Sequence, residues 1–324
     1  MEPGSLQAVS RGSLSSSSLA SPSLDSTAIS ERSIAAMFRL AGQGLFSVLF
    51  PSNCRLCESP LAEVSRLPVC SACLAAIEPI QGALCSLCGE RIMSMPLSSA
   101  QAAARCGNCE RMERPFEKAV AYGVYDSGMR ELIHLLKYDR IRPAAKVLGR
   151  MLGEVIASLY GQFPSELFEN APLVIPVPLH SSRLRQRGFN HSELIAACAL
   201  KSTPPAMRLE FGPKILVRAR ATESQTGLTE SQRRANLRGA FRLQDRQAIA
   251  GRDILLVDDV YTTGTTASEC SRVLRAGGAR RVWVATVARV LKSSISSQQF
   301  SGPLPERLPE EEEGGPSRAR AAGA

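Results

Sequence analysis

The sequence lacks any stretch of eighteen consecutive apolar residues, so it predicts no transmembrane helix. Its most apolar early segment, residues 34–50, is interrupted by Arg39 and Gln43. This segment also lacks a small-residue cleavage site and lies too far from the start for a signal peptide. We expect it to be an amphipathic helix that docks on the protein body, with binding to a membrane surface as the alternative. The absence of an export signal predicts a cytoplasmic protein without stable membrane insertion.

Both ends of the chain are poor in apolar positions. Residues 1–33 are rich in serine, and residues 293–324 carry many proline, glutamate, glycine and alanine residues. Such segments cannot bury enough apolar surface to offset the conformational entropy lost on folding. We therefore predict a disordered tail at each end.

The net charge of +9 is unevenly placed along the chain. Residues 51–118 carry equal numbers of basic and acidic side chains, whereas residues 119–292 hold a clear excess of lysine and arginine. A basic second region fits an anionic substrate, and it also fits nucleic acid.

Eight of the ten cysteines occur as Cys-x-x-Cys pairs. One such turn presents two thiolates to a tetrahedral Zn²⁺, and two turns complete a four-cysteine site. Spacers of twelve and seventeen residues suit two zinc ribbons in which consecutive pairs combine, although spacing alone also allows a crossed pairing. The predicted ligands of two structural zinc ions are Cys54, Cys57, Cys70, Cys73, Cys85, Cys88, Cys106 and Cys109.

Disulfide bonds are the alternative use of these pairs, but a cytoplasmic protein would keep its thiols reduced. Zinc ribbons often bind nucleic acid, yet eight thiolates around two Zn²⁺ add about four negative charges to a neutral segment. Because affinity for nucleic acid comes mainly from neutralising phosphates, a role in stability or protein contact is at least as well supported. Cys198 and Cys270 fall in predicted helices and are interpreted as small core residues.

The segment ILLVDDVYTTGTT, residues 254–266, places two acids and a threonine loop after an apolar run. The run over residues 254–257 is unbroken and branched, which is typical of a strand covered on both faces in a parallel sheet. Asp258 and Asp259 then fall at the carboxyl end of the strand, where open α/β sheets bind ligands. The alternative is a capped strand–turn–helix in which the two aspartates merely solvate the turn.

The loop after these acids suits a phosphate. Backbone N–H groups at the start of the next helix and the helix dipole attract anions, and the threonine hydroxyls add donors. A capping box over residues 266–269 is expected to open that helix, and Gly277-Gly278 to end it. Together with the acids, the loop fits a phosphorylated sugar whose ribose hydroxyls the aspartates hold. The predicted phosphate-binding residues are Thr262, Thr263, Gly264, Thr265 and Thr266.

Strands and helices alternate from residue 119 onward, which predicts an α/β fold with a doubly wound parallel sheet. We predict strands over residues 119–125, 172–178, 214–217, 253–257 and 281–287, and helices over 127–160 (broken at Arg142-Pro143), 189–201 and from 266. The basic tract Arg183, Arg185 and Arg187 lies between a strand and a helix, and arginine forks suit diphosphate oxygens. A solvated basic loop is the alternative. Residues 218–241 have the length and composition of a mobile lid.

Residues 254–266 resemble the motif with which type I phosphoribosyltransferases bind 5-phosphoribosyl 1-diphosphate (PRPP). Over roughly residues 45–292 the chain resembles the ComF family, competence-associated phosphoribosyltransferase-like proteins with an N-terminal double zinc ribbon. The positions that match the family pattern are Tyr125, Asp126, Arg130, Leu132, Ile133, His134, Lys137 and Tyr138, then Arg220, Thr222, Gln225, Leu228, Arg234, Asn236, Gly239, Ala240 and Phe241. His191 stands where the pattern leads us to expect glutamine.

This resemblance implies a small double zinc-ribbon module over residues 51–115, followed by a type I phosphoribosyltransferase-like domain over residues 116–292. It implies that PRPP binds together with Mg²⁺ and that Asp258 and Asp259 are the catalytic acids. It further implies a pyrophosphate loop at Pro178, Leu179, His180, Ser181 and Ser182, and additional substrate contacts at Arg183, Arg187 and Arg220.

Two functions follow from these features. The first is a phosphoribosyltransferase that transfers the phosphoribosyl group of PRPP to an acceptor that the sequence does not identify, in association with DNA uptake. The second is a non-catalytic protein that senses PRPP, or that binds single-stranded DNA or a protein of the competence machinery.

Overall fold

The computed structural model describes residues 53–61, 65–92, 104–162, 171–222 and 229–291. The predicted tails and the predicted helix over residues 34–50 lie outside the described residues. The chain divides into one unit of Met1–Ser52 with Leu61–Val64 and a second of Asn53–Pro60 with Ser65–Ala324. The second unit contains both groups of cysteines and the central sheet, and it is described here by itself. Within the described part, no helix has the length and hydropathy needed to cross a membrane.

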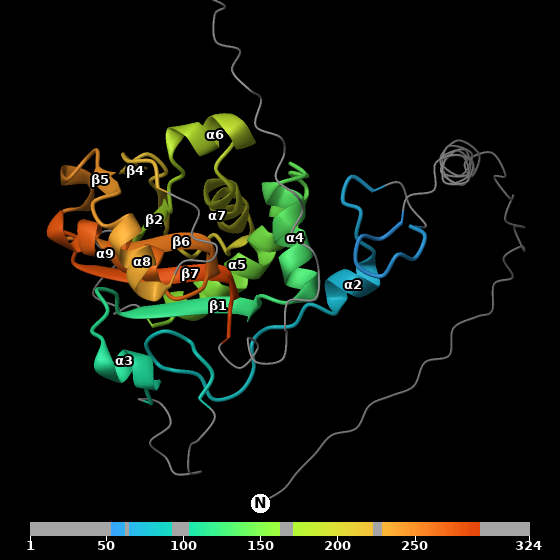
Figure 1. Cartoon of the computed structure of the whole chain (residues 1–324), viewed down its shortest axis with the longest axis horizontal. Helices are drawn as coiled ribbons and strands as arrows, with labels where there is room; N and C mark the ends of the chain where they lie inside the picture. The colour runs from blue at the N-terminus through green and yellow to red at the C-terminus, as the bar shows by residue number, and fades with distance from the viewer. Residues whose placement is uncertain (1–52, 62–64, 93–103, 163–170, 223–228, 292–324) are drawn as a thin grey trace, which may run out of the picture. The chain divides into compact units, whose positions relative to one another are not determined.

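A parallel five-stranded sheet forms the centre of this unit (Figure 1). Its strands lie in the order β1 (Lys118–Val124), β7 (Arg281–Arg289), β6 (Asp253–Tyr261), β2 (Leu173–Pro176) and β3 (Glu210–Phe211). Every neighbouring pair is parallel. The predicted α/β fold with a parallel sheet is confirmed, and β6, with the acids, occupies its middle.

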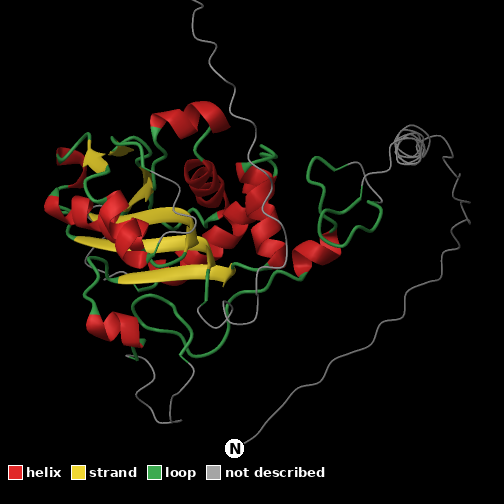
Figure 2. Cartoon of the chain, viewed as in Figure 1, coloured by secondary structure: helices red, strands yellow, loops and turns green. Residues whose placement is uncertain are grey.

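Helices cover both faces of this sheet (Figure 2). The helices α5 (Ala144–Tyr160) and α7 (His191–Ser202) pack together on one face, with α4 (Ser127–Lys137) against α5. The helix α9 (Thr265–Ala276) packs on β6 and β7 and carries α8 (Glu230–Leu237). The predicted break between α4 and α5 is confirmed: Pro143 caps α5, because proline lacks the N–H that a helix interior requires. Shorter helices are α2 (Ser71–Ala75), α3 (Gly107–Arg111), α6 (Ser181–Arg187) and the 3₁₀ turn Gln247–Ile249.

The apolar run of β6 is fully buried, as a strand between two helical layers requires. Residues 254–257 are inaccessible to solvent, and β6 pairs with β7 on one side and β2 on the other. Burial of branched side chains of this kind stabilises the fold by about 1.5–3 kcal/mol each. The strand thereby fixes the position of the two aspartates that follow the run.

Three local predictions are wrong. The strand β6 does not end before the aspartates but continues through them to Tyr261, because β7 pairs with it as far as Arg289. The strand predicted at 214–217 is β4 (Leu216–Arg218), which pairs antiparallel with β5 (Phe241–Leu243) in a separate two-stranded sheet. The strands β4 and β5 therefore flank the predicted lid, and they pair with each other rather than joining the parallel sheet.

The third error concerns the start of α9. Its N-cap is Gly264, in a left-handed conformation and without a side-chain cap, so the predicted capping box over residues 266–269 does not form. The carboxylate of Glu269 instead accepts a hydrogen bond from the Gly239 amide at 2.9 Å and pairs with Arg272 at 2.7 Å. The predicted exit at Gly277-Gly278 is confirmed, since Gly277 caps the end of α9.

Candidate functional site

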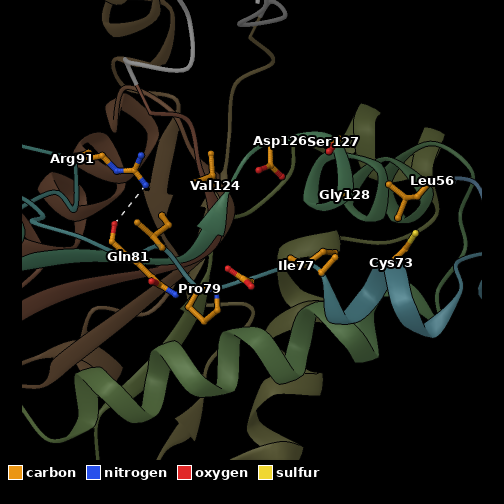
Figure 3. Close-up of a pocket in the computed structure, with 13 residues that line it drawn as sticks. Leu56, Cys73, Ile77, Pro79, Gln81, Arg91, Val124, Asp126, Ser127 and Gly128 are labelled. Atoms are coloured by element: carbon orange, nitrogen blue, oxygen red, sulfur yellow. Dashed lines mark hydrogen bonds between the residues drawn. The ribbon is translucent and has the colours of Figure 1, made fainter. Parts of the chain in front are cut away.

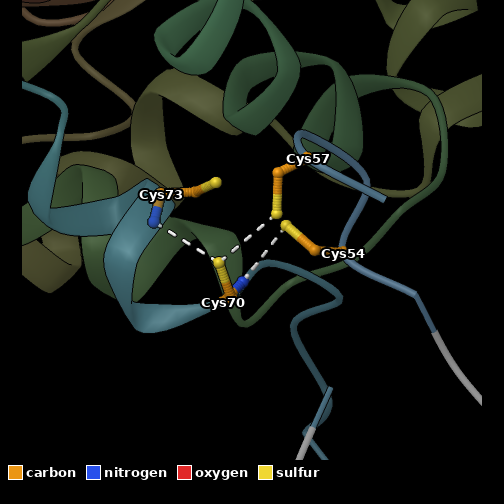
Figure 4. Close-up of side chains that lie close together, drawn as sticks. All are labelled: Cys54, Cys57, Cys70 and Cys73. Carbon is orange, nitrogen blue, oxygen red and sulfur yellow. Dashed lines mark hydrogen bonds between the residues drawn. The ribbon is translucent and has the colours of Figure 1, made fainter. Parts of the chain in front are cut away.

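The eight paired cysteines gather into two clusters of four. Consecutive pairs combine, so the clusters are Cys54, Cys57, Cys70, Cys73 and Cys85, Cys88, Cys106, Cys109, and within each the sulfur atoms lie within 4.8 Å of one another. Figure 4 shows the four sulfur atoms of the first cluster turned toward a common centre. All ten cysteines fall in the described residues, and none is in a disulfide. The crossed pairing is thereby excluded.

The surroundings of both clusters suit thiolates that bind a metal ion. Backbone amides point at the sulfur atoms: Cys70 N lies 3.3 Å from Cys54 Sγ, and Cys106 N lies 3.3 Å from Cys85 Sγ. A sulfur that carries negative charge accepts such hydrogen bonds, and four convergent thiolates match the tetrahedral preference of Zn²⁺. The donor set and the knuckle geometry fit a zinc ribbon at each cluster.

The two predicted catalytic acids lie side by side in β6 but have different environments. Asp259 is 5 % exposed, whereas Asp258 is partly exposed and lines a small pocket at the end of the strand. The two carboxylates and His191 together form a compact group, with one oxygen or nitrogen of each within 4.8 Å of the others.

Asp259 is held by two basic groups from different helices. Its Oδ2 forms an ion pair with Lys137 Nζ, from the end of α4, and lies 2.8 Å from His191 Nε2, at the start of α7. Burial by itself would raise the pKa of Asp259, but Lys137 and His191 hold that pKa well below its ordinary value. Asp259 therefore remains ionised and ties α4 and α7 to the central strand.

The role of His191 follows from its two neighbours. Burial lowers the pKa of His191, so the ring is neutral at pH 7. Arg187 Nη1 lies 3.4 Å from His191 Nδ1 and can only donate, which leaves the ring proton on Nε2, facing Asp259. Arg187, a predicted substrate contact, is thereby joined to the acids through the histidine.

Asp258 is the acid that remains available to a ligand. Its Oδ1 accepts hydrogen bonds from Ser192 Oγ and from the Asp259 amide, both at 3.0 Å. Burial, followed by the negative charge of Asp259, raises the pKa of Asp258 to about 7. A cation or a hydroxyl donor beside Asp258 would favour its charged form.

The predicted phosphate loop adjoins Asp258. Thr262, Gly264 and Thr266 line the same small pocket as Asp258, together with Val260, Tyr261, Ala267 and Thr286. Gly264 adopts φ +76°, which L side chains rarely take, and an added Cβ would collide with the Tyr261 ring. Thr263 Oγ1 and Thr265 Oγ1 lie 2.8 Å apart and bond to one another, and the loop leads into the amino end of α9. The loop and the amino end of α9, where the helix dipole is positive, thus border the pocket beside a carboxylate.

The predicted pyrophosphate loop lies after β2 and leads directly into α6. Pro178 is buried, Leu179 and His180 are half-buried, and Ser181 and Ser182 are exposed in the first turn of α6. His180 caps this helix, because its Nδ1 accepts from the Ser182 amide at 3.3 Å. Whether these residues contact a ligand stays a prediction.

The other predicted contacts are spread around the site. Arg183 Nη2 lies 3.5 Å from the Thr222 carbonyl oxygen, at the edge of the predicted lid. Arg220 donates to the carbonyl oxygens of Asn236 and Arg238 at 2.8 and 3.0 Å, so in this structure it supports the end of α8. Residues 223–228 of the predicted lid, including Gln225 and Leu228, lie outside the described residues.

Sequence reasoning missed several residues of the site. Lys137 matched the family pattern, and His191 stood out as a departure from it, but nothing in the sequence joined either to Asp259. Ser192 gave no signal beyond its place at a helix start. Arg218 is half-buried in β4, where its guanidinium bonds to Thr222 and lies 5.5 Å from the Phe241 ring centroid.

A larger pocket of about 550 Å³ lies beside the first cysteine cluster (Figure 3). Leu56, Cys73, Ile77 and Gly128 lie on one side of it, and Val124, Gln81 and Arg91 lie on the other. It shares no lining residue with the pocket at Asp258, and it has no group of basic donors that would suit a diphosphate. Size alone does not make it the candidate site.

Comparisons with known proteins agree with this organisation. Residues 45–110 match the double zinc ribbon domain family. The DNA utilization protein YhgH of Salmonella typhimurium is 31% identical over 241 residues, which cover 74% of this chain and 98% of that protein. Competence protein F of Haemophilus influenzae is 31% identical over 227 residues (68% and 96%), and competence protein ComFC of Bacillus subtilis is 25% identical over 251 residues (72% and 91%).

Among solved structures, a hypoxanthine phosphoribosyltransferase of Staphylococcus aureus is 15% identical, covering 46% of this chain and 64% of that one, with a TM-score of 0.28. A likeness at that score supports no conclusion about activity. The sequence relatives are decisive, because they match over nearly their whole length and cover more than two thirds of this chain. The chain belongs to the ComF/YhgH family of competence proteins, with a double zinc ribbon and a phosphoribosyltransferase-like domain.

Proposed function

We propose that this protein binds PRPP in the pocket at the end of β6. The observation that carries the proposal is that Asp258 and the loop of Thr262, Gly264 and Thr266 line one pocket. The loop amides and the start of α9 suit the 5-phosphate, and the Asp258 carboxylate suits the ribose hydroxyls. The loop alone would suit any anion, and the carboxylate alone would suit any hydroxyl donor. The two side by side favour a ligand that has both a phosphate and sugar hydroxyls.

Mg²⁺ fits this arrangement. Mg²⁺ is usually bound through one or two carboxylates together with phosphate oxygens and water. Asp258 has the available carboxylate, whose pKa burial and the neighbouring Asp259 charge raise, whereas Asp259 is already paired with Lys137. Asp258 would therefore face the ion, which when bound neutralises charge on the diphosphate.

We propose further that the domain transfers the phosphoribosyl group. The bond from ribose C1 to the diphosphate breaks, the diphosphate leaves with the electron pair, and an acceptor forms a new bond to C1. Positive charge develops on the ribose ring in this step, and the fixed negative charges of β6 can stabilise it. Arg187, connected to Asp259 through His191, lies on the side suited to hold the diphosphate. We propose that this chemistry takes place in the cytoplasm, where zinc-binding thiols stay reduced.

Turnover separates the enzyme from a sensor of PRPP. The zinc-loaded protein is incubated with PRPP, Mg²⁺ and a set of candidate amines and bases, and released diphosphate is measured. An enzyme releases diphosphate only with its acceptor, and much more slowly in the Asp258→Asn variant. Binding of PRPP without release, across a broad acceptor set, would instead support a sensor.

Single-stranded DNA is a second candidate ligand, favoured by a basic patch with one exposed and one half-buried aromatic ring. We define the α6 patch as Arg142, Arg183, Arg185, Arg187, Tyr138 and Phe189. Arg187 and Arg142 stack at 5.1 Å on the ring centroids of Tyr138 and Phe189, and Tyr138 is 59 % exposed. Basic side chains that follow the backbone and rings that stack on bases are the usual means of holding single strands. The relatives named for DNA utilization and competence agree with this candidate.

Substitutions within the α6 patch test that candidate. We expect Arg185→Ala to weaken the binding of an oligothymidine. It should also make the slope of log affinity against log salt concentration shallower by about one, because one phosphate contact is lost. Tyr138→Ala should weaken binding about tenfold, because loss of base stacking is worth roughly 1–3 kcal/mol. Arg246→Ala, at an exposed turn elsewhere, is the matched control. Fluorescence anisotropy across a salt series measures all three, and equal affinity for all would remove DNA as a ligand of this patch.

The cysteine clusters lead to a prediction about metal content. We propose that each binds one structural zinc ion, so the protein purified without added metal retains about two. Cys54→Ser should lower the melting temperature more than Cys198→Ser, because zinc binding at such sites is coupled to folding. Cys198, half-buried on α7, is outside both clusters. Elemental analysis and thermal melting measure these effects, and a zinc-free protein with full stability would refute the assignment.

A further inference from the structure

The last residue of β6, Tyr261, is buried directly behind the phosphate loop. Its side chain is 4 % exposed, and its hydroxyl has no hydrogen-bond partner among the residues that the structure describes. A Cβ on Gly264 would lie 2.1 Å from the hydroxyl oxygen, so the loop backbone passes immediately over it. Leaving a buried hydroxyl unpaired is costly. Its position indicates a hydrogen bond that forms when the loop takes its ligand-bound conformation.

The ring of Tyr261 rests on Arg289, its partner in the adjacent strand β7. The two residues are paired in register, and the guanidinium carbon lies 4.7 Å from the ring centroid. The ring of Phe116 contacts Tyr261 edge-on, with centroids 6.4 Å apart. Phe116 follows the second cysteine cluster in the chain and shares one apolar core with it. Arg289 and Phe116, which are not part of the loop, thus hold the Tyr261 ring in place.

Arg289 is in turn held by the second cysteine cluster. Its Nη2 lies 2.8 Å from Glu90 Oε2 and 3.7 Å from Cys88 Sγ, and its Nη1 donates to the Cys88 carbonyl oxygen. Arg289 and Glu90 are 3 % and 7 % exposed. A buried ion pair of this kind adds little stability compared with apolar packing, so its best-supported use is to fix a geometry. Here it fixes the contact between the knuckle around Cys88 and the ends of two central strands.

We propose that the second cysteine cluster positions the phosphate loop through Arg289 and Tyr261. Tyr261 is then a positioning residue, whose hydroxyl supports the loop when phosphate is bound. This inference rests on the proposed phosphate site. Zinc that positions the loop in this way strengthens phosphate binding, and because coupling between two sites is reciprocal, bound phosphate strengthens zinc binding by the same factor. The first cluster has no such connection to the loop among the described contacts.

The test uses the full zinc-loaded chain with ribose 5-phosphate as the probe. Tyr261→Phe keeps the ring on Arg289 and removes only the hydroxyl. We expect the affinity for ribose 5-phosphate to fall about three- to tenfold, as for the loss of one hydrogen bond. The melting temperature without ligand should stay unchanged or rise, because an unpaired buried hydroxyl is removed. A hydroxyl with a purely structural role would lower stability and leave affinity alone.

Arg280→Met is the matched control. It breaks the ion pair between Arg280 Nη2 and Asp253 Oδ2, which lie 2.9 Å apart. This pair is at the start of β6 and β7, whereas Tyr261 and Arg289 are at the end of the same strands. This variant should lose stability and keep the affinity for ribose 5-phosphate. Zinc affinity gives a second readout. With saturating ribose 5-phosphate, we expect a chelator to remove one of the two zinc ions only at a higher concentration than without it. That difference should be smaller in Tyr261→Phe by the same factor as the affinity.

Two negative results are distinguishable. If the wild type binds ribose 5-phosphate and Tyr261→Phe binds it equally well, the positioning role is wrong and the phosphate site stands. If the folded wild type binds neither ribose 5-phosphate nor PRPP, the phosphate site itself is wrong, and the inference is overturned with it.

Discussion

Lys137→Met should lower the free energy of unfolding by about 3 kcal/mol or more, because it leaves the buried Asp259 carboxylate without its cation. The lysine side chain is 17 % exposed and the aspartate side chain 7 %, so solvent replaces the lost partner poorly. Methionine keeps the length of the side chain and removes its charge. Urea unfolding at pH 7 measures the change. Lys118→Met is the control, because Lys118 bonds to the neutral Gln162 side chain at the surface and should cost well below 1 kcal/mol.

The pair can be separated from simple packing by a double-mutant cycle. Asp259→Asn alone leaves the Lys137 charge buried without a partner and should also be strongly destabilising. The double variant Lys137→Met with Asp259→Asn should lose less unfolding free energy than the two single variants added together. The folded-state pKa of Asp259 lies below its unfolded value, so its contribution is present at neutral pH and is lost as the pH falls below about 4. Wild type should therefore lose more stability than Lys137→Met between pH 7 and pH 3. If the stability losses of the two single variants add up to that of the double variant, the contact between Lys137 and Asp259 contributes nothing to stability.

Asp258→Asn should weaken PRPP binding in Mg²⁺ by at least tenfold while leaving the zinc content unchanged. The substitution keeps the shape of the side chain and removes a charged acceptor, and such hydrogen bonds are worth about 1.5–3 kcal/mol, or about ten- to a hundredfold in affinity. Asp245→Asn is the matched control, since Asp245 caps a turn through the Ala248 amide at 3.0 Å and lies outside the pocket. Titration calorimetry compares the three proteins. Equal affinity in folded Asp258→Asn would mean that Asp258 only supports its turn.

The pH dependence of binding tests the same residue independently. Because burial and Asp259 raise the pKa of Asp258 to about 7, part of the protein holds Asp258 protonated near neutrality. Affinity for Mg²⁺–PRPP should therefore rise as the pH rises from 6 to 8. The Asp258→Asn series over the same range reports what ionisation of the ligand contributes. A wild-type profile that runs parallel to that of the variant would contradict a role for Asp258 in its charged form.

The parts of the fold that sequence predicts are those with a local physical cause. The apolar run of β6 identified a doubly covered strand, Pro143 identified a helix break, and the cysteine spacing gave the ligand sets. Each of these depends on residues close together in the chain. The residues of the capping box were equally suggestive, yet Glu269 bonds to Gly239 and Arg272 instead, because tertiary contacts can override a local motif.

The sequence placed the acids beside the loop, as the structure does, but it gave no indication of the contacts that support them. Lys137 and Asp259 meet from segments far apart in the sequence, and Arg289 reaches Glu90 across most of the chain. No periodicity or spacing reports such pairs. The sequence treated the two aspartates as equivalent, and only the tertiary contacts separate them, because Asp259 is paired with Lys137 and His191 whereas Asp258 lines the pocket.

Recognition of a phosphorylated ribose that carries a diphosphate is the function we propose for the pocket at Asp258. Its most direct test is calorimetric titration of the zinc-loaded wild type in Mg²⁺ with PRPP, ribose 5-phosphate and inorganic diphosphate. We expect one PRPP site per chain, with weaker binding of ribose 5-phosphate and of diphosphate, because each contains only part of the contacts. Diphosphate binding as tight as PRPP, or no PRPP binding by folded protein, would contradict the claim.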